Sequence, residues 1–250
     1  MLSFICASNK PKVLKECVIS SLEKQKDRDF ELVVVDTTLK QYASAVEALN
    51  EGADRAKGDY FVFLHQDIQF EDEDFISKLR GFINQGPFLI AGVAGVVPAK
   101  LKWRKKILTN IVHGEDRINP GEPIHGNSVV SCNTVDECLF VIPRDIYVRR
   151  PLIEYVPTWH LYAVEYCLWA EQSEPGSVKI FPLRLWHQSD GASFDASYYT
   201  ALNRIIGVYK GHYKVLYTTM GAWPASVFLR GIRGLIKRIV LMEQKIRGSK

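Results

Sequence analysis

A histidine and an aspartate two positions apart, His65 and Asp67, are the residues of this sequence best suited to chemistry. They follow residues 60–64, a short apolar, aromatic and β-branched run that predicts a strand buried on both faces. In open α/β sheets, ligands bind outside the carboxyl ends of strands. Both side chains are potential ligands of a divalent cation, and Asp67 suits a hard, phosphate-bound ion such as Mg2+ or Mn2+. A polar strand end that leads into an acidic helix cap is the alternative interpretation.

Two further groups could take part in chemistry. His187 directly follows the apolar run of residues 178–186, although a lone histidine at a strand end is more often a structural residue than a ligand. Asp136 and Glu137 lie near the start of a predicted strand over residues 134–144. These groups become interesting if the fold brings them to the same edge of a sheet as His65 and Asp67.

The elements that must position these residues begin with alternating strands and helices. The pattern predicts a strand over 2–7, an amphipathic helix over 12–25, a strand over 30–35, a helix over 42–55 and the strand over 60–64. This alternation predicts an α/β fold with a mostly parallel central sheet flanked by helices. Three polar strand ends therefore meet at one edge, at Ala7-Ser8-Asn9, at Asp36 and at His65-Gln66-Asp67.

The rest of the chain is less regular. An acidic run over 71–74 leads into a helix ending at residue 83, where acidic side chains favour the helix start. A strand is predicted over 88–97, and residues 98–133 are expected to form a long variable segment, basic around Trp103. Later elements are the strand over 134–144, a helix over about 159–171, the apolar run over 178–186 and helices over 198–217 and 227–247.

Composition restricts the function classes. The chain has 250 residues, of which 47% are hydrophobic and 24% charged, as expected for one globular domain with or without an appendage. A net charge of +4 is too small to indicate nucleic acid by itself, because that inference needs a concentrated basic stripe, and we expect no nucleic-acid partner. The five cysteines lie in apolar segments and are expected to be reduced core residues of a cytoplasmic protein. We expect neither a secretion signal nor a membrane-spanning segment.

The order of these motifs resembles family 2 glycosyltransferases of the GT-A (Rossmann-like) nucleotide-diphospho-sugar transferase fold. The resemblance spans about residues 2–217 and depends on residues 2–9, 32–36, 48–60 and 63–67. The segments 65–67, 134–137, 159–163 and 185–189 are similar to a small bacterial and archaeal branch with His-Gln-Asp in place of Asp-x-Asp. In such proteins a bound cation stabilises the departing diphosphate.

The resemblance implies a donor site and a metal, Mn2+ or Mg2+. Asp67 matches the last aspartate of the Asp-x-Asp motif, whose first position is His65 here, and His187 matches the late histidine of the family, a second metal ligand. Asp36 matches the carboxylate that hydrogen-bonds the uracil or ribose, or it could be an ordinary turn cap. The other implied nucleotide-sugar contacts are Ala7, Ser8, Asn9, Asn50, Gly52, His65 and Gln66.

An inverting transfer needs a general base within hydrogen-bond reach of the acceptor hydroxyl. The Glu-Asp pair that the family carries would fall at about Tyr162-Ala163, and neither side chain can take a proton in this role. The remaining candidates are Asp136, Glu137, His160 and Glu165, of which Asp136 and His160 flank the expected acceptor cleft. Glu165 could instead orient its helix.

The resemblance also suggests an organisation of the chain. We expect residues 1–97 to bind the nucleotide sugar, residues 98–220 to bind a glycan or lipid-linked acceptor, and residues 221–250 to form a basic amphipathic segment. Such a segment suits the inner face of a membrane, or alternatively packing on the domain or on a second copy in a homodimer. Liposome co-sedimentation with and without residues 224–250 tests the membrane hypothesis, which equal binding would contradict.

Three rival functions remain at this stage. A nucleotidyltransferase would want a glycine-rich phosphate loop after the first strand, where this chain has Ala7-Ser8-Asn9. A retaining glycosyltransferase would be revealed by the stereochemistry of the product. A catalytically inactive relative, or a carbohydrate- or nucleotide-binding module, is favoured by His65 at the first motif position, and metal-dependent donor hydrolysis would count against it.

Overall fold

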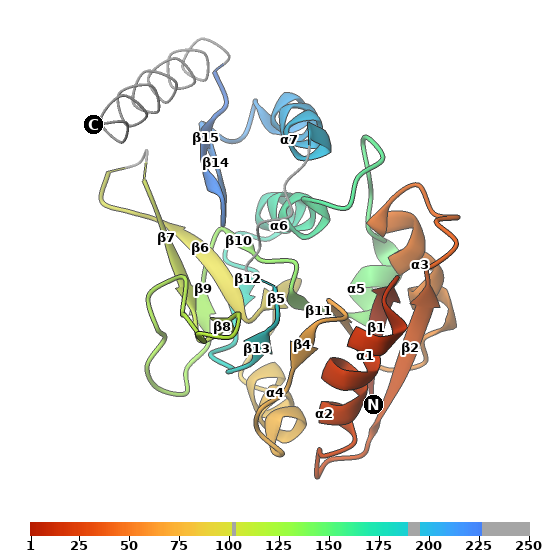
Figure 1. Cartoon of the computed structure of the whole chain (residues 1–250). Coiled ribbons are helices and arrows are strands. Elements are labelled where there is room, and N and C mark those ends of the chain that lie inside the picture. The colour runs from red at the N-terminus through yellow and green to blue at the C-terminus, as the bar shows by residue number, and fades with distance from the viewer. Residues whose placement is uncertain (102–103, 190–195, 227–250) are drawn as a thin grey trace, which may run out of the picture.

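The central element is a seven-stranded sheet flanked by helices (Figure 1). The computed structural model describes residues 1–101, 104–189 and 196–226. The strand order is β2-β1-β3-β11-β5-β12-β9, in which β11 and β9 run against the other strands. The strands are β1 (Leu2–Ser8), β2 (Phe30–Asp36), β3 (Tyr60–Leu64), β5 (Ile90–Gly92), β9 (Val130–Ser131), β11 (Leu139–Pro143) and β12 (Val178–Ile180).

Alternation along β1 divides the core into two layers. Leu2, Phe4 and Cys6 point to one face, whereas Ile5 points to the other, because successive side chains of a strand alternate. The first layer packs against the N-terminal helices and α4 (Phe75–Ile83). The second layer packs against α3 (Ala45–Arg55), α5 (Arg144–Arg149) and α6 (Tyr162–Ser173). All five cysteines are buried and free, as expected for core thiols.

The helices begin and end where local chemistry dictates. The helix expected over 12–25 consists of α1 (Pro11–Leu14), a π-helical turn η1 (Lys15–Ile19) and α2 (Ser20–Leu22). Helix α3 begins after Ser44, which has an extended backbone. The Ser44 hydroxyl caps the helix because it accepts from the Glu47 N–H. Helix α6 begins later than expected, because Leu161 has a left-handed backbone with φ of 66°.

Two predicted strands are each divided between two sheets. The strand expected over 88–97 consists of β5 and β6 (Ala94–Pro98), and the one over 134–144 consists of β10 (Thr134–Val135) and β11. Strands β10, β6 and β7 (Lys105–Thr109) form a second sheet. Gly92 allows the close approach of the two sheets, because a Cβ there would lie 2.6 Å from Val135 Cβ. Asp136 and Glu137 therefore lie in the break between β10 and β11 and not inside a strand. The Asp136 N–H donates to the Ala94 carbonyl there.

Residues 98–133 are more ordered than the sequence suggested. Besides β7 and β9, this segment contains β8 (Val112–His113), which joins β13 (Trp186–His187) and β4 (Ile68–Gln69) in a three-stranded sheet of order β4-β13-β8. The apolar run expected over 178–186 accordingly divides into β12 and β13. This small sheet brings residues from three distant parts of the chain together (Figure 1).

The C-terminal part also differs from expectation. The helix expected over 198–217 is α7 (Ala196–Tyr209), and it is followed by a hairpin of β14 (Val215–Thr218) and β15 (Gly221–Pro224). The boundary expected between residues 220 and 221 falls in the turn of that hairpin. The segments 102–103, 190–195 and 227–250, including the predicted basic helix, lie outside the described residues. Across residues 1–101, 104–189 and 196–226, no helix has the length and apolarity needed to cross a bilayer.

Candidate active site

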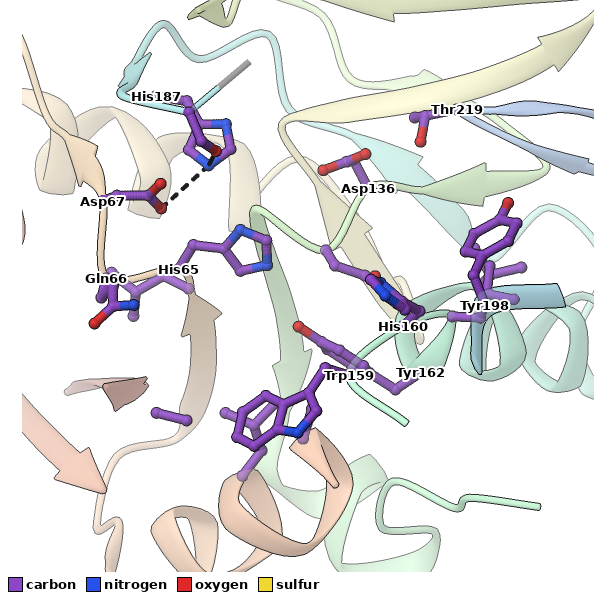
Figure 2. A pocket seen from close by; sticks show the side chains of 18 of the residues that line it. His65, Gln66, Asp67, Asp136, Trp159, His160, Tyr162, His187, Tyr198 and Thr219 are labelled. Carbon is purple, nitrogen blue, oxygen red and sulfur yellow. Dashed lines mark hydrogen bonds and ion pairs between the residues drawn. The ribbon is translucent and has the colours of Figure 1, made fainter. Parts of the chain in front are cut away.

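A pocket of about 480 Å³ lies at the carboxyl ends of β1 and β3 (Figure 2). One wall comes from the strand ends and α3, and the opposite wall comes from the turn before β11, the start of α6, α7 and the β14–β15 hairpin. The predicted site residues that line it are Ala7, Asn9, His65, Gln66, Asp67, Asp136, Glu137, His160 and His187. The fold therefore gathers most of the predicted site from separate parts of the chain.

Three side chains in this pocket form a candidate metal centre. One ligand atom from each of His65, Asp67 and His187 lies within 4.8 Å of the others. Of these atoms, His187 Nε2 and Asp67 Oδ1 lie 3.2 Å apart. The antiparallel pairing of β13 with β4 holds this pair in place, because the Gln188 N–H donates to the Asp67 carbonyl at 2.9 Å. His65, predicted as a nucleotide contact, thus also has the geometry of a ligand.

The charge state of this cluster suits a cation. Burial opposes ionisation of Asp67, but the hydrogen bond from His187 and the nearby imidazoles outweigh it and hold the pKa of this carboxyl well below its usual range. Burial, with a contribution from His187, lowers the pKa of His65. Burial likewise lowers the pKa of His113. One carboxylate together with imidazole nitrogens is a donor set that transition-metal dications accept.

Gln66 connects the ends of two strands. Its Oε1 accepts from the Ser8 hydroxyl at 2.8 Å and from the Lys10 N–H at 2.9 Å, and its Nε2 donates to Asn9 Oδ1 at 2.8 Å. Ser8 is almost fully buried and does not line the pocket. The hydrogen bonds of Gln66 therefore stabilise the loop that follows β1, and this loop forms part of the pocket.

Besides Ser8, three more predicted nucleotide contacts do not line the pocket. Asp36 is exposed and caps a turn, where its Oδ1 accepts from the Thr38 N–H at 2.8 Å, while the next residue, Thr37, lines the pocket. The Asn50 side chain donates to the Leu152 carbonyl at 3.0 Å and accepts from the Tyr147 hydroxyl. Gly52 lies where a Cβ would meet the Ile5 side chain at 2.6 Å, so it allows close packing of α3 on β1. Asn50 and Gly52 are therefore corrected to packing positions.

Asp136 and His160 face the pocket from the wall opposite Asp67 (Figure 2). Asp136 Oδ1 accepts from the Cys138 N–H at 3.0 Å, which fixes the turn between β10 and β11. The His160 ring packs edge-on against Tyr198, with centroids 5.7 Å apart. Both candidates therefore face the metal cluster across the pocket.

Glu137 differs from its neighbour because its carboxyl is buried. Burial and the adjacent Asp136 raise the pKa of Glu137 to about 8, although backbone N–H groups at the start of α6 act in the opposite direction. Its Oε1 is buried and has no hydrogen-bond partner. At neutral pH this group is mostly a neutral acid, which argues against its acting as the general base.

This raised pKa predicts a pH-dependent stability. Between the ordinary pKa of 4.5 and about 8, the folded state binds a proton that the unfolded chain has lost, so stability from this group falls as pH rises through that window. We expect wild type to lose on the order of 4 kcal/mol relative to Glu137→Gln between pH 5 and pH 8.5, since each pKa unit between 4.5 and about 8 is worth about 1.36 kcal/mol. Urea unfolding of both proteins at the two pH values measures this. Parallel pH profiles of the two proteins would contradict it.

Glu165 does not reach the pocket of Asp136. It is buried in α6, where both carboxylate oxygens accept from Arg150 Nη2, at 2.6 and 2.7 Å, and Oε1 also accepts from the Tyr209 hydroxyl at 2.7 Å. Arg150 in turn lies over the rings of Tyr166 and Trp169, 4.9 Å from each centroid. Glu165 is therefore corrected from a candidate base to a residue that anchors α6.

Removal of the Glu165 carboxylate is expected to lower the free energy of unfolding strongly. Glu165→Leu leaves the Arg150 charge buried without its partner, and we expect a loss of about 3–5 kcal/mol in the free energy of unfolding. The double variant Glu165→Leu with Arg150→Met should regain most of that loss, because no unpaired charge remains. Urea unfolding measures both. A single variant as stable as wild type but devoid of activity would return Glu165 to the list of candidate bases.

His113 and Thr219 are among the residues of the site that the sequence did not reveal. His113 lines the pocket beside His187, but it comes from the segment 98–133, whose irregular pattern gives no sign that a strand forms there. Thr219, in the turn of the β14–β15 hairpin, also lines the pocket, and the sequence predicts helix up to residue 217. A pattern that repeats within one element cannot reveal pairings between distant short strands.

Comparison with known proteins agrees with this architecture. A family model described as "Glycosyltransferase like family" matches residues 3–209. No curated protein matches the chain. Among solved structures, GalNAc-T7 with UDP, GalNAc and Mn2+ superposes with a TM-score of 0.62 at 14% identity, over 86% of this chain and 49% of that one. S. aureus TarS 1–349 in complex with UDP-GlcNAc gives 0.59 at 12% identity, over 82% of this chain and 65% of that one. The chain thus spans less than two thirds of either structure.

Proposed function

The chain belongs to the glycosyltransferase-like family and has the GT-A fold, and from this premise we propose that it transfers a sugar from a nucleotide-diphosphate donor to a glycan or lipid-linked acceptor, with inversion. The observation that carries the proposal is the cluster of His65, Asp67 and His187 at the carboxyl edge of the sheet, facing a pocket of about 480 Å³. A pocket of this size suits a ligand such as a nucleotide sugar. The bound nucleotides of the structural neighbours, UDP and UDP-GlcNAc, favour a uridine donor.

The donor set fits a divalent cation. An ionised carboxylate and two imidazole nitrogens would hold Mn2+ more readily than Mg2+, which prefers oxygen ligands. When bound, the ion would act as a Lewis acid that neutralises charge on the leaving diphosphate. The Mn2+ in the GalNAc-T7 structure supports the same preference.

The side chains and backbone on the two walls suggest separate roles. Asn9, Lys10 and Thr37 line the pocket near the ends of β1 and β2, and we assign them to the nucleotide, with Lys10 a potential partner for phosphate. Trp159 is 44% exposed although it lines the pocket, and an exposed indole ring suits stacking on a sugar. Asp136, on the wall opposite Asp67, is the candidate that accepts the proton of the acceptor hydroxyl.

A thermal-shift screen tests this proposal. UDP, GDP, dTDP and CDP are each added with and without Mn2+ to wild type and to Asp67→Ala. A ligand that binds only the folded state at a hundredfold excess over its dissociation constant adds about 2.7 kcal/mol of stability. We expect one nucleotide to shift the unfolding temperature of wild type, to need Mn2+, and to have no such effect on Asp67→Ala. If no nucleotide shifts the protein under either condition, the donor site is wrong.

The second candidate function is binding without transfer. It is favoured by His65 at the first motif position and by Tyr162 and Ala163 where the resemblance expects the Glu-Asp pair, both of them buried in α6. A binding module would show the same nucleotide shift but no turnover. Release of nucleoside diphosphate from the donor in the presence of Mn2+ separates the two, because only an enzyme breaks the glycosidic bond.

A further inference from the structure

His113 lies beside the candidate ligand His187 because their backbones are paired. Strand β8 runs parallel to β13, and the register places His113 opposite His187. The Gly114 N–H donates to the His187 carbonyl at 3.0 Å, and the Trp186 indole N–H donates to the Gly114 carbonyl at 2.7 Å. The two imidazoles meet with their Nδ1 atoms 3.2 Å apart. This contact is therefore built into the small sheet.

The two nitrogens of His187 face different partners. Nε2 faces Asp67 Oδ1 at 3.2 Å and the Ser189 hydroxyl at 3.1 Å, whereas Nδ1 faces His113. A cation shared with Asp67 would take the lone pair of Nε2. The proton of a neutral His187 must then be on Nδ1, and a ligating histidine normally donates that outer N–H to an acceptor. His113 Nδ1 is the atom in that position.

Without a metal, the hydrogen bonds favour the opposite arrangement. His113 Nδ1 lies 3.1 Å from the Ser189 carbonyl, which can only accept, so in that contact His113 carries its proton on Nδ1. The same Nδ1 atom lies 3.2 Å from His187 Nδ1, which must then accept. His187 consequently carries its proton on Nε2 and donates it to Asp67 Oδ1. In this tautomer the Nε2 lone pair is not free for a cation.

We propose that His113 is a positioning residue for the metal ligand His187, and that the two rings exchange tautomers when the cation binds. His187 releases its Nε2 proton to solvent and receives at Nδ1 the proton from His113 Nδ1. His113 takes up one proton at its own Nε2, so the number of protons on the pair does not change. His113 then accepts from His187 and no longer donates to the Ser189 carbonyl. This inference depends on the metal site of the proposed function and adds a residue outside the ligand set.

The proposal predicts which substitutions matter at position 113. Leucine offers no acceptor, so the outer N–H of His187, a residue only 5% exposed, would remain without a partner. Loss of such a partner lowers metal affinity by about 10- to 100-fold. Asparagine offers an amide oxygen near the place of Nδ1, so His113→Asn should bind the cation nearly as well as wild type.

The first experiment is a titration of the full chain with Mn2+ alone, followed by the EPR signal of the free ion. We expect a dissociation constant raised about 10- to 100-fold in His113→Leu, largely restored in His113→Asn, and unchanged in His125→Leu, a control at an exposed histidine. Thermal unfolding of the metal-free variants checks that each is folded. If His113→Leu binds Mn2+ as tightly as wild type, the inference about His113 is wrong, whereas the proposed metal site still stands.

The second experiment observes the tautomers themselves. Long-range ¹H–¹⁵N spectra of histidine-labelled protein are recorded without metal and with Zn2+, a diamagnetic probe that imidazole and carboxylate ligands accept. We expect His113 to change from the Nδ1–H to the Nε2–H form when Zn2+ is added, which a purely structural histidine would not do. A His113 that keeps Nδ1–H in the zinc-loaded protein also overturns the inference. If wild type binds neither ion, or Asp67→Ala binds Mn2+ equally well, the metal site of the proposed function fails as well.

Discussion

Asp67→Ala is expected to reduce donor turnover by about 10³-fold or more. A cation at this site would supply several kcal/mol of charge stabilisation to the leaving diphosphate, and each 1.36 kcal/mol corresponds to a factor of ten in rate. Asp67 is the carboxylate of the cluster, and its pKa is held well below the usual range by His187 and His65 against the effect of burial. Its removal leaves two imidazole nitrogens, a much weaker site for a hard cation.

The measurement is the rate of nucleoside diphosphate release from saturating donor, at several Mn2+ concentrations. Asp116→Ala is the matched control, because Asp116 is exposed and does not line the pocket. Excess Mn2+ should not restore Asp67→Ala to the wild-type rate. A variant that turns over at the wild-type rate, with the same dependence on Mn2+, would show that the cation is held elsewhere or is not needed.

The sequence predicted the edge of the sheet at which the site forms. Residues 2–7, 30–35 and 60–64 each carry a buried pattern that ends in polar residues, and parallel strands bring such ends together. Asp67 and His187 were both predicted as ligands, and the structure places them 3.2 Å apart. The contact itself depends on β4 and β13, strands of two residues each, which are too short to leave a periodic pattern.

The wrong assignments have a common physical cause. Asn50 and Gly52 were assigned to the pocket from the resemblance, and Glu165 was a candidate base because it lies near the expected acceptor helix. In α3 and α6, however, these residues do not line the pocket. The Asn50 side chain donates to the Leu152 carbonyl, and Gly52 allows close contact with Ile5. Glu165 forms an ion pair with Arg150. Which face of a helix points to a pocket is decided by tertiary packing, which sequence position alone does not determine.

Substitution of the candidate general base, Asp136, is also expected to have a large effect on the rate of transfer. Asp136→Asn should lower kcat by about 10²- to 10⁴-fold, the usual contribution of a positioned base, with little change in donor binding. The helix anchor Glu165 is paired with an arginine and Glu137 is kept mostly as a neutral acid by burial, whereas Asp136 faces the pocket from the wall opposite Asp67 (Figure 2). Asparagine preserves the size of the side chain and can still accept from the Cys138 N–H, so the turn between β10 and β11 should persist.

Comparison of three variants identifies the base. Asp136→Asn, Glu137→Gln and His160→Gln are each assayed for kcat with the acceptor that supports turnover, and for the Mn2+-dependent thermal shift with nucleoside diphosphate. A base at position 136 predicts a normal shift in all three proteins and a large loss of kcat in Asp136→Asn alone. Loss of kcat in His160→Gln with near-normal Asp136→Asn would move the role to the imidazole, which lines the same wall. Because the thermal shift reports the donor side and kcat also depends on the acceptor side, a base defect cannot be mistaken for a damaged metal site.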